Sequence, residues 1–93
     1  MSLILIVEDN EKNLKLARDI LRAKGYATIE AVNGNDGVRM AREHHPDMVL
    51  MDIQLPDISG IEVFMQLRAD PSTASIPAVA FTASVTAADR SRI

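Results

Sequence analysis

The sequence predicts an α/β fold in which a parallel sheet lies between helices on both faces, as a three-layer sandwich. Three continuous apolar runs of strand length, at residues 3–7, 48–51 and 78–81, are typical of parallel strands buried on both faces. Segments with apolar residues at helical spacing alternate with these runs. Strands that alternate with helices form parallel sheets through right-handed crossovers, which place helices above and below the sheet.

The first strand, residues 3–7, ends abruptly at Glu8 and Asp9. Asn10 is a helix-capping residue type and Gly25 is a typical helix stop, so the first helix is expected between them. The apolar face predicted for this helix comprises Leu14, Ala17, Ile20 and Leu21.

The second strand is expected at residues 27–31, and its more polar composition suggests a place near an edge of the sheet. Residues 33–34 are turn formers, and Asn35 or Asp36 is expected to cap the second helix. This helix should end before Pro46, which cannot continue it. Its predicted inward residues are Val38 and Ala41.

The third strand, residues 48–51, is followed by Asp52 and by turn formers between residues 54 and 60. Asp52 is therefore expected at the carboxyl edge of the sheet, where open α/β sheets bind ligands. The third helix should end near residues 70–71, because a residue that precedes proline disfavours helix. Its predicted apolar face comprises Ile61, Val63, Phe64 and Leu67.

After the fourth strand, residues 78–81, hydroxyl side chains beginning with Thr82 take the place of the acids that follow the other strands. Thr86 is expected to cap a further helix from Ala87, within which the sequence ends. The five methionines, together with Phe64 and Phe81, are expected to fill the core.

The composition limits the possible functions. A chain of 93 residues is expected to form one domain, because too few apolar residues would remain to form a second hydrophobic core. A formal net charge of -3 and scattered basic residues argue against a nucleic-acid-binding surface. The absence of cysteine excludes disulfides, thiolate metal sites and a thiol nucleophile, and is compatible with a cytoplasmic location. No apolar run is long enough to cross a bilayer, so no membrane partner is expected.

The acids at the strand ends predict a metal site. If the first and third strands are neighbours, three carboxylates converge: those of Glu8, Asp9 and Asp52. When carboxylates lie this close, either the pKa of one of them rises or they bind a cation. Oxygen ligands with space for water suit Mg²⁺ best. A carboxylate beside Mg²⁺ can attack phosphorus, because the cation screens the repulsion between the two anions. Asp52 would then form an acyl phosphate, and the Thr82 hydroxyl could donate to a phosphoryl oxygen.

Three short motifs, in this order, make the chain resemble the receiver domain of two-component response regulators. They are V-E-D-N at residues 7–10, M-D-I-Q-L-P-D-I-S-G at residues 51–60 and A-F-T-A at residues 80–83. The resemblance covers the whole chain, and is greatest to stand-alone regulators of the bacterial cell-cycle type and to receivers of hybrid kinases. It implies a flavodoxin-like, doubly wound parallel sheet with strand order 2-1-3-4.

The resemblance also implies roles for the site residues. Glu8 and Asp9 match the acidic pair that holds Mg²⁺, and Asp52 matches the phosphoacceptor, which is also a metal ligand. Thr82 matches the switch hydroxyl. Three further matches lie in the loop after the phosphoacceptor: the backbone carbonyl of Gln54, as the remaining metal ligand, and Pro56 and Gly60.

The implied function is that of a phosphoacceptor module in a phosphorelay. Asp52 would take a phosphoryl group from a phosphohistidine on a histidine kinase or histidine phosphotransfer protein, and the change around Thr82 would alter a surface bound by a downstream protein. Such a module is not expected to be a turnover enzyme. Receivers also have a fifth strand ending in a lysine, followed by a fifth helix, and neither is present here. Residues 1–93 are therefore expected to be a receiver domain that is incomplete at its C-terminus.

Two other functions remain open. A degenerate receiver would act through protein contacts alone. A phosphohydrolase with an aspartyl nucleophile typically has a second acid two residues later, where this chain has Gln54, so a general acid is lacking. His44 and His45, at a helix end before Pro46, are expected to be solvated and to have no role in phosphotransfer.

Overall fold

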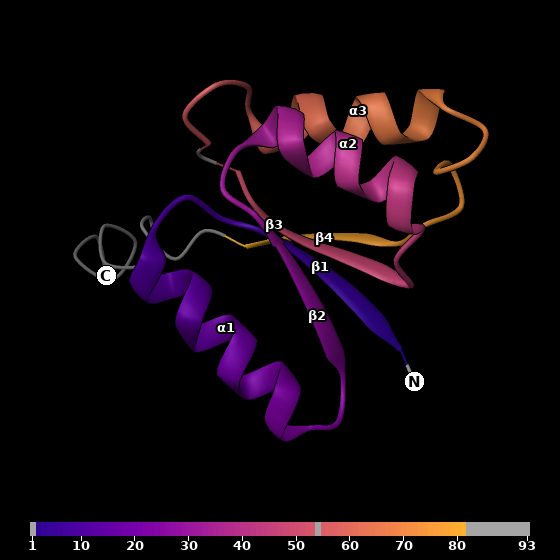
Figure 1. Ribbon diagram of the computed structural model, residues 1–93. Coiled ribbons are helices and arrows are strands. Elements are labelled where there is room, and N and C mark those ends of the chain that lie inside the picture. Colours follow the sequence, from indigo (N-terminus) through magenta and orange to yellow (C-terminus); the bar gives the residue numbers. More distant parts are fainter. Residues whose placement is uncertain (1, 54, 82–93) are drawn as a thin grey trace, which may run out of the picture.

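The computed structural model describes residues 2–53 and 55–81, and its strands and helices alternate along the chain. None of its helices is long and apolar enough to span a membrane. The further helix expected from Ala87 lies outside the described residues. The elements are β1 (Leu3–Val7), α1 (Glu11–Ala23), β2 (Ala27–Ala31), α2 (Gly34–His44), β3 (Met48–Asp52), α3 (Gly60–Ala69) and β4 (Ala78–Phe81), as Figure 1 shows.

The four strands form one parallel sheet in the order β2-β1-β3-β4. Helix α1 covers one face of the sheet, and α2 and α3 cover the other (Figure 1). The predicted three-layer sandwich and strand order are confirmed, and β2 lies at an edge as its polar composition indicates. In the central pair, Val7, the last residue of β1, lies opposite Met51 of β3, and β3 continues one residue further to Asp52.

The core lies on both faces of the sheet, because successive side chains of a strand point to opposite sides. On the α1 face, Ile4 and Ile6 pack with Leu14. Full burial of one such side chain contributes about 1.5–3 kcal/mol to the free energy of folding. An unbroken apolar strand therefore stabilises the packing of helices on both faces of the sheet. The core on the other face comprises, among others, Leu5, Val7, Val38, Ala41, Val49, Met51, Val63 and Leu67.

The helix starts are fixed by side-chain caps. Asn10 caps α1 as predicted, since its Oδ1 accepts hydrogen bonds from Lys12 N and Asn13 N at 2.9 and 3.1 Å. The predicted cap of α2, Asn35 or Asp36, is wrong. Asn33 has extended backbone and its Oδ1 accepts from Asp36 N at 2.8 Å, so the helix already begins at residue 34.

Several apolar side chains predicted to be buried are exposed, because a helix buries only one stripe. Successive helix positions differ by about 100°, so Val63 and Leu67 share the buried stripe of α3, Phe64 lies beside it, and Ile61 lies on the opposite side of the helix. Of the methionines, Met51 is in the core and Met40 packs against it. The exposed fractions are 49 % for Ile20, 62 % for Ile61, 39 % for Phe64 and 59 % for Met65.

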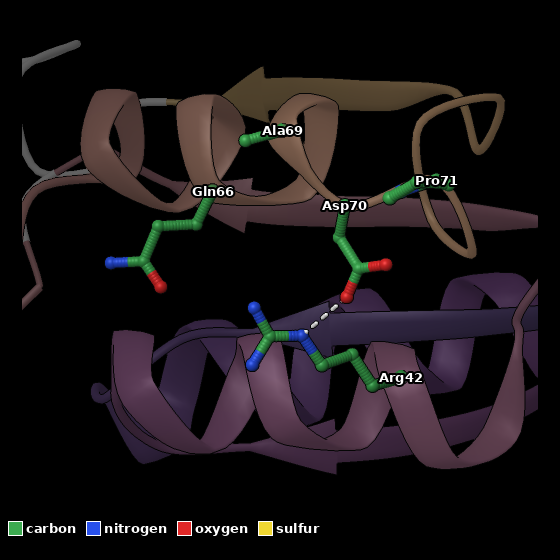
Figure 2. Close-up of a pocket in the computed structure, with 5 residues that line it drawn as sticks. All are labelled: Arg42, Gln66, Ala69, Asp70 and Pro71. Carbon is green, nitrogen blue, oxygen red and sulfur yellow. Dashed lines mark hydrogen bonds and ion pairs between the residues drawn. The ribbon is translucent and has the colours of Figure 1, made fainter.

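An ion pair joins α2 to α3 on the outside of the molecule. Arg42 Nε donates to Asp70 Oδ2 at 2.8 Å, and Figure 2 shows the guanidinium facing α3. Asp70, which precedes Pro71, has extended backbone, so α3 ends near residues 70–71 as predicted. The groove around this pair is lined by Arg42, Gln66, Ala69, Asp70 and Pro71.

Candidate functional site

Three carboxylates meet at the carboxyl edge of the sheet. Glu8 and Asp9 follow β1, and Asp52 ends β3, its neighbour in the sheet. One carboxylate oxygen from each of the three residues lies within 4.8 Å of the other two. The predicted convergence of these acids is therefore confirmed, and it results from the parallel pairing of β1 with β3.

The cluster is buried on one side and open on the other. Glu8 is 0 % exposed and Asp52 is 3 % exposed, whereas Asp9 is exposed. A ligand could therefore approach from the Asp9 side and reach carboxylates that are otherwise shielded from water. Shielding matters because electrostatic interactions are stronger where water is excluded.

The two carboxylate oxygens of Glu8 have different surroundings. Asn13 Nδ2 donates to its Oε1 at 3.0 Å. Its Oε2 is buried and has no hydrogen-bond partner among the described residues. Burial raises the pKa of Glu8 to about 7, and the neighbouring Asp52 carboxyl group adds to that rise. Glu8 therefore favours its protonated form unless a cation nearby offsets the cost of its charge.

These features fit Mg²⁺. The cluster offers hard oxygen ligands, an open side for water, and a buried carboxylate oxygen that no described donor satisfies. A cation would favour the charged form of Glu8 and so oppose the burial, and the smaller effect of Asp52, that raise its pKa. Gln54 and Thr82, the other two predicted site residues, lie outside the described residues.

The loop after Asp52 is packed tightly where α3 begins. Gly60 N donates to Ile53 O at 2.8 Å. A Cβ on Gly60 would lie 2.7 Å from the Asp52 carbonyl oxygen, closer than real Cβ atoms approach. Gly60 is needed here because only hydrogen fits, so its predicted place in this loop has a steric reason.

The same loop is tied to the start of α2 by Asp57. Its Oδ1 accepts from Gly34 N at 2.8 Å and its Oδ2 accepts from Asn35 N at 2.9 Å. These backbone donors, with that of Asn35 foremost, lower the pKa of the Asp57 carboxyl group. A carboxylate at a helix N-terminus also interacts favourably with the helix dipole. The loop between β3 and α3 is thereby anchored to a second element.

Sequence reasoning missed Asp57 and Asn13 as residues that support the site. Asp57 is a common turn residue, so its presence needs no distant partner to explain it. Asn13 is the third residue of α1, where an asparagine gives no local signal of a contact with Glu8. The sequence indicated only that Asn13 lies in the first turn of the helix that follows the acidic pair, and therefore near it.

Comparison with known proteins places these features in a family context. The family described as "Response regulator receiver domain" matches residues 4–93. The polar-differentiation response regulators DivK of Brucella ovis and Brucella anthropi are each 50% identical to the chain over 90 residues. The matches cover 97% of this chain and 73% of each relative.

Solved structures show the same similarity. The receiver domain of a sensor histidine kinase from Pseudomonas aeruginosa PAO1, with a magnesium ion coordinated in its active site cleft, superposes with a TM-score of 0.85 at 33% identity. That match covers 97% of this chain and 74% of the other. The signal receiver domain of a histidine kinase from Syntrophus aciditrophicus gives a TM-score of 0.84 at 30% identity, covering 88% of this chain and 62% of the other. The predicted similarity to cell-cycle regulators and hybrid-kinase receivers is confirmed.

Proposed function

This chain belongs to the response regulator receiver domain family of two-component signalling, and we therefore propose that Asp52 is the phosphoacceptor of a phosphorelay. The observation that carries the proposal is the gathering of Glu8, Asp9 and Asp52 within 4.8 Å at one edge of the sheet. Asp52 combines burial with a position at the open edge, as a carboxylate nucleophile requires.

The proposed donor is a phosphohistidine on a histidine kinase or histidine phosphotransfer protein. A carboxylate oxygen of Asp52 attacks the phosphorus, an O–P bond forms, and the N–P bond breaks. The electron pair of the broken bond stays on the imidazole, which takes up a proton from water. The product is an acyl phosphate on Asp52.

We propose that Mg²⁺ is held by the carboxylates of Glu8, Asp9 and Asp52 and by the backbone carbonyl of Gln54. When bound, it would neutralise the acids and stabilise negative charge on the phosphoryl oxygens. The chain itself holds the acids in place: β1 positions Glu8 and Asp9, and β3 with its packed loop positions Asp52.

The proposed output is a change of surface. The phosphoryl group adds negative charge and acceptor oxygens, to which the Thr82 hydroxyl would donate. The resulting rearrangement would alter the affinity for a downstream protein partner. In this role the domain is a cytoplasmic switch that is phosphorylated and dephosphorylated, and turnover of a free substrate is not its function.

The test is phosphorylation by a small phosphodonor such as phosphoramidate, read by intact-protein mass spectrometry. We expect the mass of one phosphoryl group to be added in the presence of Mg²⁺, and not in EDTA. Asp52→Asn should abolish the gain. Asp19→Asn, which changes an exposed acid of α1, should not. A wild-type protein that gains no mass would overturn the proposal and favour a receiver that acts through protein contacts alone.

A further inference from the structure

Asn13 contacts the acidic cluster from outside it. Its side chain is half-buried in the first turn of α1, and its Nδ2 donates to Glu8 Oε1 at 3.0 Å. The backbone of Asn13 is itself held, because its N–H donates to the capping Asn10 Oδ1 at 3.1 Å. The amide is thus presented to Glu8 from a capped helix start and not from a loop.

Because of this contact, the two carboxylate oxygens of Glu8 are in different environments. Oε1 receives the amide proton of Asn13, while Oε2 is buried and has no hydrogen-bond partner in the described part of the chain. A buried carboxylate oxygen without a donor is costly, so the carboxylate is left with one oxygen to be satisfied by another group. A cation at the cluster would supply that group.

The chemistry of the amide suits this task. An asparagine amide donates a hydrogen bond but carries no charge, so it can orient a carboxylate without competing with a cation for the same negative charge. A lysine or arginine here would neutralise Glu8 and repel Mg²⁺. Partners that hydrogen-bond to a metal-ligating carboxylate commonly orient it in this way.

We propose that Asn13 is a positioning residue for metal loading, which holds Glu8 so that one carboxylate oxygen remains free for Mg²⁺. The inference rests on the proposed function, because it concerns the same cation site. It goes further in assigning a role to a residue outside the acidic cluster, and in predicting that this role is exerted through Glu8.

The direct test is Mg²⁺ affinity, measured by isothermal titration calorimetry on the intact protein without any phosphodonor. Asn13→Leu keeps the approximate shape of the side chain and removes the donor. Loss of such a supporting partner typically weakens metal binding about 10- to 100-fold, so we expect at least a roughly tenfold loss. Gln66→Leu likewise removes an amide that donates to a carboxylate, that of Glu62 on α3, and should keep the wild-type affinity. Affinity within about twofold of wild type in Asn13→Leu would overturn the inference.

A double-mutant cycle tests whether Asn13 acts through Glu8. In a Glu8→Gln background, Asn13→Leu should cause little further loss of Mg²⁺ affinity, since the carboxylate it positions is gone. Additive losses would overturn the inference. Far-UV circular dichroism should show Asn13→Leu folded, because leucine favours helix more than asparagine does.

These experiments distinguish a failure of the role proposed for Asn13 from a failure of the role proposed for Asp52. If Asn13→Leu retains wild-type Mg²⁺ affinity while Asp52 is still phosphorylated, the positioning role alone fails. If Mg²⁺ binds in an Asn13-dependent manner but Asp52 gains no phosphoryl group, the phosphoacceptor role alone fails. A wild-type protein that binds no Mg²⁺ overturns the positioning role together with the metal site.

Discussion

Gly60, the first residue of α3, lies directly against the backbone of Asp52. A Cβ on residue 60 would be 2.7 Å from the Asp52 carbonyl oxygen and 2.8 Å from the Cα of Ile53. The Gly60 amide also donates to the Ile53 carbonyl at 2.8 Å. The strand end that carries the proposed nucleophile is therefore positioned partly by close backbone packing against the next helix.

Replacing Gly60 by alanine should displace this strand end. The extra methyl group meets backbone atoms, which cannot rotate away, so we expect a loss of about 1–3 kcal/mol in the free energy of unfolding and weaker Mg²⁺ binding. Urea unfolding and calorimetry would measure the two effects.

Gly25→Ala is the matched control: its φ of 93° strains alanine, but nothing lies within 4 Å of the added carbon. The control should lose about 1–2 kcal/mol of stability and keep its Mg²⁺ affinity. Wild-type behaviour of Gly60→Ala would contradict the packing argument.

Replacing Asp57 by asparagine should loosen the loop from α2. Asparagine places an NH₂ donor where one carboxylate oxygen now accepts, so in the present geometry either Gly34 N or Asn35 N would face another donor. We expect a lower melting temperature at neutral pH. Because the pKa of Asp57 is lowered in the folded protein, its stabilising contribution is present above the ordinary aspartate pKa and is lost as pH falls through the folded value.

The difference in melting temperature between wild type and Asp57→Asn should therefore shrink in acid. Thermal melts from neutral to acidic pH would show this convergence. Glu43→Gln, which alters an exposed acid paired with Arg39 on α2, serves as the control and should change the melting temperature little. A difference for Asp57→Asn that stays constant down to low pH would mean that its carboxylate charge is not what anchors the loop.

The elevated pKa of Glu8 makes stability fall as pH rises in the absence of metal. The pKa is about 7 when folded, against an ordinary value of 4.5. Between those values the folded protein keeps a proton that the unfolded chain has released, so the free energy of unfolding decreases with pH across that range and then levels off. With allowance for solvent screening, the expected loss is about 1–3 kcal/mol.

This pH dependence can be measured by denaturant unfolding in EDTA between about pH 5 and pH 8. Glu8→Gln carries no titratable group at this position, so its profile should lack the decrease and it should be the more stable protein at the upper end. An identical pH profile for wild type and Glu8→Gln would show that Glu8 is not the group responsible.

The sheet and its acidic edge could be predicted because their signals are local. A parallel strand buried on both faces is an unbroken apolar run, and Asp52 marks where such a run stops. The placement of Glu8 and Asp9 follows in the same way from the end of the first run. Parallel pairing then brings these strand ends together without any further information.

The parts that could not be predicted depend on contacts between distant residues or on backbone conformation. The partner of Asp57 lies more than twenty residues earlier, at Gly34 and Asn35. Asn33, Asn35 and Asp36 are all good capping types, so composition could not choose among them, and the extended backbone at Asn33 decides. The exposure of Ile61 depends on the orientation of α3, which Val63 and Leu67 fix by packing into the core.

Mg²⁺ should stabilise the folded protein, since the three acids are brought together only by folding. Ligand binding to the folded state alone raises the free energy of unfolding by about 1.4 kcal/mol for each tenfold rise of free ligand above its dissociation constant. Thermal melts over a series of Mg²⁺ concentrations should therefore show a rising midpoint, reversed by EDTA. Asp52→Asn and Glu8→Gln should reduce the rise, because each removes a charged ligand, while Asp19→Asn should preserve it. A full rise in Asp52→Asn would place the cation elsewhere. The comparison of these variants thus locates the metal independently of any phosphoryl transfer.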